Sequence, residues 1–405
     1  MLKVIRFTTA GESHGKGMTV ILEGIPAGLP LRSGDIAAEL GRRQVGHGRG
    51  ERMRIETDAG EILSGVRLGE TLGSPVAIWI RNRDFANWEV AMSADPVPGA
   101  DDEALRRVFL PRPGHADLVG LLKYDRRDVR DVLERASARE TAARVAAGSI
   151  AKRLLAEFGV SVGSHVTRIG DVEAVTPDPL PSDLNQVADA SPVRCLDRVA
   201  EGRMVEAIEA ARAAGDTLGG VFEVVALELP VGLGTFVSWE GRLDGRLAGA
   251  LMSIQAMKGV EVGMGFRAAA SRGSQVHDEI ERNGSARRAG GYRRRRNNAG
   301  GLEGGSTTGE PLVVRAAMKP LSTLMRPLDS VDVRTGEPAG AVTERSDVCA
   351  VPAAAVVGEA MVALVLADAM REKFGGDSLE EMRANYEAYL DRVNRRWTDR
   401  DESSS

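Results

Sequence analysis

Two histidines stand in short, glycine-containing motifs that are suited to proton transfer. They are His14 in Gly11-Glu-Ser-His-Gly15 and His115 in Arg112-Pro-Gly-His-Ala-Asp117. Glycine lets the backbone approach a ligand closely, and an unperturbed histidine, with a pKa of about 6.5, can exchange a proton near neutrality. A histidine beside glycine is also common in ordinary turns, so each motif alone leaves both interpretations open.

Arginine clusters add a second chemical theme. They are Arg42-Arg43-Gln-Val-Gly-His-Gly-Arg49, Arg135-Ala-Ser-Ala-Arg139 and Arg345-Ser-Asp347. Guanidinium groups bind phosphate and carboxylate through paired hydrogen bonds, so several converging clusters predict a pocket for a small molecule with several anionic groups. The alternative for any single arginine is a surface ion pair, which contributes roughly 0 to 1 kcal/mol.

Two further stretches are candidates for cofactor contact: Asn297-Asn-Ala-Gly-Gly-Leu-Glu-Gly-Gly305 and Met318-Lys-Pro-Leu-Ser-Thr323. Neither matches the P-loop pattern, and no G-x-G-x-x-G fingerprint stands between a predicted strand and a helix. The sequence also lacks H-E-x-x-H and clustered histidine and cysteine, so ATP hydrolysis, a Rossmann site and a transition-metal site are all disfavoured. The Arg293 to Arg296 run is more typical of a solvated or anion-facing loop than of a nucleic-acid patch.

Helical and strand patterns alternate along the chain that must position these residues. Apolar residues recurring every three or four positions predict helices at 33–43, 137–158, 203–214, 243–257, 352–374 and 379–393. Apolar or β-branched runs bounded by glycine or proline predict strands at 18–23, 76–80, 221–229 and 312–317. This interleaving indicates an α/β fold.

No segment has the composition of an interdomain linker. We therefore expect residues 1–395 to form a single domain, followed by a disordered polar tail at 396–405. Two segments, Gly69–Pro75 and Gly305–Pro311, share the pattern G-x-T-x-G-x-P, and each precedes an apolar strand. The match is short and rich in glycine, so an internal duplication is possible but not decided by it.

The overall composition is typical of an ordinary globular enzyme. The chain is 43% hydrophobic and 27% charged, and its net charge of −5 argues against a dedicated nucleic-acid-binding protein. Cys195 and Cys349 are too few for a disulfide framework or a zinc site, and we expect buried thiols. We find neither a secretory signal nor an apolar run of about 18 residues for a membrane span, so we expect a cytoplasmic protein.

Seven motifs, taken together and in order, resemble the chorismate synthase family over nearly the whole chain. A single one would be weak, but seven in order are hard to reach by chance. They are Gly11-Glu-Ser-His-Gly15, Gly41-Arg-Arg-Gln-Val-Gly-His-Gly-Arg49, Arg112-Pro-Gly-His-Ala-Asp117, Arg135-Ala-Ser-Ala-Arg-Glu-Thr141, Gly215-Asp-Thr-Leu-Gly-Gly220, Asn298-Ala-Gly-Gly-Leu-Glu-Gly-Gly305 and Arg345-Ser-Asp-Val-Cys349.

The resemblance implies a monofunctional carbon–oxygen lyase of the shikimate pathway, which leads to aromatic amino acids. Its substrate would be 5-enolpyruvylshikimate 3-phosphate, and a 1,4-anti elimination of phosphate would give chorismate. Reduced FMN (FMNH2) would be required although no net oxidation occurs, and an external reductant would supply it; NADP is a further association of the family. Such chemistry needs a water-poor pocket in which cationic groups stabilise the leaving phosphate.

The resemblance also implies roles for individual residues. His14 would donate a proton to the flavin, His115 would protonate the leaving phosphate, and Asp347 would assist proton removal through the flavin. The substrate's anionic groups would be held by Ser13, Arg43, Arg49, Arg112, Arg139 and Arg345. The FMN contacts would come from Arg135, Ala136, Ser137, Gln255, Ala256, Gly304, Lys319, Pro320, Leu321, Ser322, Thr323 and Arg345.

The fold that the resemblance implies is a single-domain β-α-β sandwich of four layers, with helices outside two sheets, assembled as a homotetramer. Two rival functions remain open at this point. A flavin oxidoreductase would use the same FMN pocket but consume one reductant per turnover. An arginine-rich RNA-binding module would show affinity that falls steeply with salt, and the net charge of −5 already counts against it.

Overall fold

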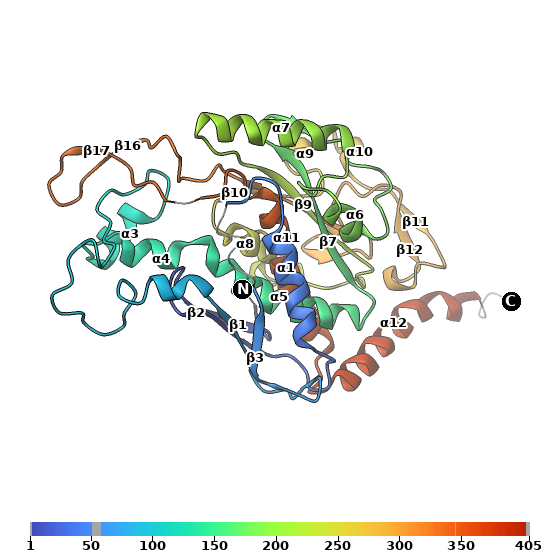
Figure 1. Cartoon of the computed structure of the whole chain (residues 1–405). Helices are drawn as coiled ribbons and strands as arrows, with labels where there is room; N and C mark the ends of the chain where they lie inside the picture. Colours follow the sequence, from blue (N-terminus) through green and yellow to red (C-terminus); the bar gives the residue numbers. More distant parts are fainter. Residues whose placement is uncertain (1, 51–57, 345, 402–405) are drawn as a thin grey trace.

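The computed structural model describes residues 2–50, 58–344 and 346–401 (Figure 1). Two antiparallel sheets form its framework. The first has the order β1-β2-β6-β3 and is built from β1 (Arg6–Gly11), β2 (Gly17–Glu23), β6 (Val76–Arg81) and β3 (Gly60–Ser64). The second has the order β10-β15-β9-β7-β8 and is built from β10 (Met257–Val262), β15 (Leu312–Met318), β9 (Gly220–Leu227), β7 (Ser161–Ile169) and β8 (Val172–Glu173).

Each sheet buries one face against a long helix. In the first sheet Val20 of β2 and Ile78 of β6 are fully buried and lie opposite each other, and α5 (Thr141–Ala156) packs on both strands. In the second sheet α11 (Val351–Phe374) packs on β7, β9 and β15. The two helices also pack against each other.

Small residues allow this close approach of α5 and α11. A Cβ atom added at Gly148 of α5 would lie 2.5 Å from Cα of Ala360 in α11. A Cβ at Gly358 of α11 would likewise overlap the ring of Phe222 in β9. Glycine is needed at both positions because the neighbouring atoms already occupy the space of a side chain.

The two halves of the chain repeat the same strand order. The order β1-β2-β6-β3 in the first sheet has its counterpart in β7-β9-β15-β10 in the second. The two G-x-T-x-G-x-P segments also make matching contacts. The hydroxyl of Thr71 donates to the Pro26 carbonyl at 2.6 Å, and the hydroxyl of Thr307 donates to the Pro230 carbonyl at 2.6 Å. The two segments with the shared G-x-T-x-G-x-P pattern therefore also resemble each other in their structural surroundings.

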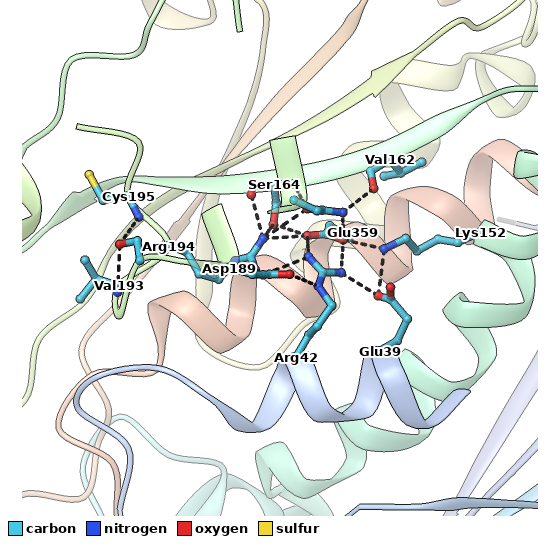
Figure 2. A network of polar contacts seen from close by, with 12 residues as sticks. Glu39, Arg42, Lys152, Val162, Ser164, Asp189, Val193, Arg194, Cys195 and Glu359 are labelled. Atoms are coloured by element: carbon cyan, nitrogen blue, oxygen red, sulfur yellow. Dashed lines mark hydrogen bonds and ion pairs between the residues drawn. The ribbon is translucent and has the colours of Figure 1, made fainter. Parts of the chain in front are cut away.

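A buried ionic network ties α1 (Ser33–Gln44) to α5, α11 and β7 (Figure 2). Glu359 of α11 is fully buried, and it accepts hydrogen bonds from Arg42 at 2.8 Å, Lys152 at 2.7 Å and Arg194 at 3.1 Å. Burial alone would raise the pKa of Glu359, but these cations lower it well below the usual value. Arg42 therefore belongs to the scaffold although it precedes Arg43 in the sequence.

Most predicted elements are confirmed with small shifts at their ends. The helix predicted at 243–257 ends earlier, as α8 (Leu243–Met252), and the chain then enters β10. The helix predicted at 203–214 begins earlier, as α7 (Arg198–Ala214). The last helix, α12 (Leu379–Asp401), continues into the segment expected to be a disordered tail, and residues 402–405 lie outside the described residues.

Two expectations from composition can also be compared with the structure. Both cysteines are free and buried, as predicted. Contrary to the expectation that no segment qualifies, Val351–Phe374 is long and apolar enough to cross a membrane, but that window is completely buried inside the protein. This segment is the core helix α11, which packs against the second sheet and α5.

The remaining elements are short or peripheral, and α6 and α7 contact β7. The remaining helices are η1 (Arg83–Asn87), α3 (Asp117–Tyr124), α4 (Arg130–Ala136), η2 (Ala138–Glu140), α6 (Leu184–Asp189), η3 (Trp239–Gly241), α9 (Phe266–Ala269), α10 (Gly273–Val276) and η4 (Arg287–Ala289). The remaining strands are β4 (Val66–Arg67), β5 (Glu70–Thr71), β11 (Ile280–Arg282), β12 (Tyr292–Arg294), β13 (Leu302–Glu303), β14 (Ser306–Thr307), β16 (Asp329–Val331) and β17 (Pro338–Gly340).

Candidate active site

A cavity of about 1120 Å³ brings together segments from both halves of the chain. Its wall includes the loop after β1, the C-terminal end of α1, the turn between α4 and α5, the segment after β15 and the first turns of α11. This volume slightly exceeds the roughly 300 to 1,000 Å³ of a typical small-molecule pocket. The cavity therefore has room for a cofactor and a substrate side by side.

His14 is held on this wall by a buried carboxylate. Its Nδ1 lies 2.8 Å from Oε1 of Glu134, and its ring stacks on Trp88 with the ring centres 3.8 Å apart. Burial alone would raise the pKa of Glu134, but the hydrogen bonds from His14 and Arg130 lower it below its usual value. The carboxylate is therefore ionised at neutral pH, and Nδ1 of His14 carries the proton that it accepts.

His115 has a parallel arrangement with Asp117. Its Nδ1 lies 2.5 Å from Oδ1 of Asp117 and 3.1 Å from Nη2 of Arg112. Nδ1 cannot both donate to Asp117 and accept from Arg112, and the shorter, charge-assisted contact to Asp117 takes precedence. Burial alone would raise the pKa of Asp117, but hydrogen bonds from His115 and Arg112 lower it well below its usual value. Nε2 is therefore the nitrogen through which His115 can act on a ligand.

Asp58 connects two of the candidate substrate-binding arginines. Its Oδ1 accepts from Nη1 of Arg139 at 2.5 Å, and its Oδ2 accepts from Nη1 of Arg43 at 3.3 Å. Arg43 also donates to the Thr141 hydroxyl, and Arg139 donates to the Asn82 side chain. Both guanidinium groups are therefore fixed in place before any ligand arrives, which reduces the entropy that binding costs.

The electrostatics of this cluster favour an anionic ligand. Burial lowers the pKa of Arg43 to about 9, with Asp58 acting in the opposite direction and the neighbouring Arg49 and Arg139 lowering it further. An anion near these three cations would relieve their mutual repulsion. Arg49 meanwhile pairs with Asp347, whose Oδ2 lies 2.5 Å from Nη1 and whose Oδ1 accepts from the Gly50 amide.

Several basic groups that face the cavity are held from behind by buried carboxylates. The basic side chains that face it include His14, His115, Arg43, Arg112 and Arg139. The carboxylates that hold these groups lie behind them and do not line the cavity: Asp58 and Asp117, both fully buried side chains, and Glu134. Other carboxylates, including Glu344 and Asp347, do line the cavity, so its wall carries charges of both signs with an excess of basic groups.

Another part of the wall is apolar and suits a flat ring. It is formed by Ile254, by Ala353 and Val357 of α11, and by other aliphatic side chains. Next to it the side-chain oxygen Oε1 of Gln255 is buried without a hydrogen-bond partner among the described residues. Buried carbonyl oxygens are rarely left unpaired, so this atom is a candidate acceptor for an N–H group of a bound cofactor. A planar heterocycle with ring N–H groups, such as a flavin, fits this wall.

Comparison with known proteins places the chain in a family. The family model of chorismate synthase matches residues 5–371. The chain is 56% identical over 393 residues to the chorismate synthase of Geobacter sulfurreducens, covering 96% of this chain and 99% of the relative. It is 57% identical over 391 residues to that of Frankia casuarinae, covering 96% and 98%.

A crystal structure of a chorismate synthase also superposes on the chain, with a TM-score of 0.77, 45% identity and coverage of 97% of this chain and 99% of the other.

The chain belongs to the chorismate synthase family. The identification made from seven motifs is thereby confirmed, and with it the interpretation as a phosphate lyase of the shikimate pathway.

Most of the residues that the family resemblance singled out line the cavity. They are Ser13, His14, Arg43, Arg49, Arg112, His115, Ala136, Ser137, Arg139, Gln255, Ala256, Lys319, Pro320, Leu321, Ser322, Thr323 and Asp347. Of the described candidates, Arg135 and Gly304 do not line it: Arg135 instead donates to the backbone of Thr9 and Gly11. Arg345 lies outside the described residues.

The chorismate synthase motifs did not reveal several residues that shape the site. Asp58, Trp88 and Glu134 were not singled out, although each contacts a candidate residue. No local pattern marks them, because their partners are distant in the sequence. Asp117 could have been found, since it completes the motif that contains His115. The predicted cofactor stretch 297–305 does not line the cavity, whereas residues 318–323 do.

Proposed function

We propose that this chain eliminates phosphate from 5-enolpyruvylshikimate 3-phosphate to give chorismate, and that the reaction takes place in the cavity described above. The family match supports the reaction class. The observation that carries the assignment to this cavity is its lining, where two histidines backed by buried carboxylates stand among Arg43, Arg49 and Arg139. A substrate with a phosphate and carboxylates would find several fixed guanidinium partners there.

The proposed reaction is redox-neutral. The bond between ring carbon C3 and the phosphate oxygen breaks, a hydrogen leaves C6 on the opposite face, and a conjugated diene forms. Reduced FMN, if held by this cavity, would supply electron density to the substrate while the phosphate leaves and an acceptor for the C6 hydrogen. The protein's part is to bind the anions, orient the ring and exclude water.

The histidines supply protons at defined atoms in this proposal. His115 would hold a proton at Nε2 for the leaving phosphate, while Asp117 stabilises the imidazolium through Nδ1. His14 would act in the same way toward the flavin side of the cavity, and Asp347 would assist removal of the C6 proton. The distance between Asp347 and Arg49 is 2.5 Å, so substrate binding would have to share or displace this ion pair.

The apolar wall is the proposed place for FMN. Contacts would come from Ala136, Ser137, Gln255, Ala256 and the segment Lys319 to Thr323. Burial lowers the pKa of Lys319, and the nearby Lys258 adds to this effect. Both effects disfavour the charged form of Lys319, and an anionic phosphate of the cofactor would stabilise that form. Arg345 remains part of the proposal, whereas Arg135 and Gly304 do not line the cavity.

The binding part of this proposal can be tested with Arg139→Ala. We expect this variant to bind the substrate more weakly, with a loss of roughly 2 to 5 kcal/mol in binding free energy. A loss of this size is typical when one partner of a buried charge pair is removed. Arg293→Ala is the matched control, since the Arg293 side chain is 57% exposed and pairs with Glu281 on the surface. Calorimetry that shows equal affinity for both variants would place the substrate elsewhere.

The same proposal covers the organisation of the molecule. We propose one domain over residues 1–395, four layers in the order sheet, helix, helix, sheet, and an origin by duplication of the repeated strand order. We also propose a cytoplasmic homotetramer that depends on an external flavin reductant. Phe236, Val237 and Trp239 support self-association, because they are 78 to 81% exposed and adjacent in the chain. Sedimentation of wild type and Trp239→Glu would test this.

A further inference from the structure

Glu134 makes an unusual number of contacts with the loop that carries His14. Its backbone carbonyl accepts from the Ser13 amide at 2.9 Å, and its Oε2 accepts from the His14 amide at 2.8 Å. Its Oε1 lies 2.8 Å from Nδ1 of the His14 ring. One residue of α4 thus fixes both the backbone and the ring of His14, across 120 positions of sequence.

Trp88 fixes the plane of the same ring. The indole and imidazole planes are inclined by only 20°, and the indole N–H donates to Asp84 at 3.1 Å, which holds the indole in turn. Arg106 also lies over Trp88, with Cζ 4.0 Å from the ring centre. Trp88 is 9% exposed, so the stack is largely shielded from solvent.

We propose that Glu134 and Trp88 are positioning residues for His14: Glu134 keeps the ring proton on Nδ1 and thereby assigns proton transfer to Nε2, and Trp88 keeps the ring in the plane that faces the cavity. The inference rests on the proposed role of His14 as an acid. Neither residue belongs to the seven motifs: Glu134 directly precedes the motif that begins at Arg135, and Trp88 lies far from all of them.

The proton balance of this arrangement is simple. The imidazolium form of His14 carries protons on both nitrogens, donates the one on Nε2 and keeps the one on Nδ1, which Glu134 continues to accept. Arg130 donates to the same carboxylate at 3.1 Å, so Glu134 keeps a cationic partner after the transfer. No proton needs to move between His14 and Glu134, and the imidazolium is stabilised by a fixed negative charge.

Glu134→Gln is the central test. The amide can donate as well as accept, so Nδ1 no longer has to carry the proton. In ¹⁵N-histidine spectra of the protein, with the His14 signals assigned by their loss in His14→Ala, we expect neutral His14 of the wild type in the Nδ1–H form. The Glu134→Gln variant should show a shift toward Nε2–H. An unchanged tautomer would overturn the proposal.

Kinetics provide a second readout. We expect Glu134→Gln to lower kcat about 10- to 100-fold, the size of effect found for carboxylates that orient metal-bound histidines. KM should change little, because Glu134 does not line the cavity. Combined with His14→Ala, the same substitution should cause no further loss. An equal loss in both backgrounds would show that Glu134 acts on the fold and not through His14.

A matched control is available elsewhere in the molecule. Glu223 and His165 form another buried histidine–carboxylate pair, 3.1 Å apart, and neither residue lines the cavity. Glu223→Gln should therefore leave kcat and the His14 tautomer unchanged. For Trp88, Trp88→Ala should lower kcat and Trp88→Phe should restore most of it; equal activity of the two variants would contradict its part. If the wild type forms no chorismate, the proposed function fails, but the tautomer spectra still test Glu134.

Discussion

Substitution of Asp58 by asparagine should reveal how strongly the arginine cluster depends on its buried counter-charge. The Asp58 side chain is fully buried, and its two partners, Arg43 and Arg139, are 5% and 3% exposed at their side chains. Removing one partner of a buried ion pair commonly costs about 3 to 5 kcal/mol. Both arginines keep neutral partners, including Thr141 and Asn82, so we expect a loss near the lower end, about 3 kcal/mol.

An anion should recover much of this loss. With the carboxylate gone, inorganic phosphate can lie between Arg43 and Arg139, and a ligand present at about 100 times its dissociation constant stabilises the native state by about 2.7 kcal/mol. We therefore expect phosphate to raise the melting temperature of Asp58→Asn more than that of the wild type. Asp391→Asn is the control, because Asp391 pairs with Arg287 on the surface, where both side chains are more than half exposed, and should change stability by less than about 1 kcal/mol.

Urea unfolding and calorimetric melting in phosphate and in an uncharged buffer would measure both effects. Two results would contradict the expectation: Asp58→Asn unfolds at the same urea concentration as the wild type, or phosphate stabilises Asp58→Asn and the wild type equally. Either result would show that Asp58 is not the counter-charge on which Arg43 and Arg139 depend.

Three further predictions concern the core and the proton donors. Gly148→Ala should destabilise the protein by about 1 to 3 kcal/mol in urea unfolding, because the new methyl group would press on Ala360; wild-type stability would refute this contact. Glu359→Gln should destabilise by about 3 to 5 kcal/mol at neutral pH. The folded-state pKa of Glu359 is lowered, so its stabilisation is present above about pH 4.5 and is lost as the pH falls through that lowered pKa. The difference in unfolding free energy between the variant and the wild type should therefore become smaller in acid. A difference that stays constant with pH would contradict this role of Glu359. His14→Ala and His115→Ala should each remain folded, as judged by circular dichroism, but lose about 10² to 10⁴ in kcat; wild-type kcat in both would make these histidines structural.

The motifs revealed much of the site because they are local. His14, His115 and Arg139 each stand in a short segment whose glycines and charges are recognisable without the fold. Likewise, helices with continuous apolar periodicity, such as α5 and α11, were found within a few residues of their true ends.

What the sequence could not provide are contacts between distant segments. Asp58 and Arg139 are 81 positions apart, and His14 and Glu134 are 120 positions apart, yet each pair forms a direct hydrogen bond. The contact between α5 and α11 could not be predicted for the same reason. A helix that is apolar all round, such as α11, must be buried, but its sequence does not say between which layers.

The proposed elimination of phosphate can be measured in an anaerobic assay with reduced FMN and 5-enolpyruvylshikimate 3-phosphate, in which chorismate absorbance, phosphate release and the flavin spectrum are followed together. We expect chorismate and phosphate to form in equal amounts over many turnovers per flavin, and the flavin to be still reduced at the end. Oxidation of one flavin per product would instead indicate an oxidoreductase, and the absence of chorismate would contradict the proposed function.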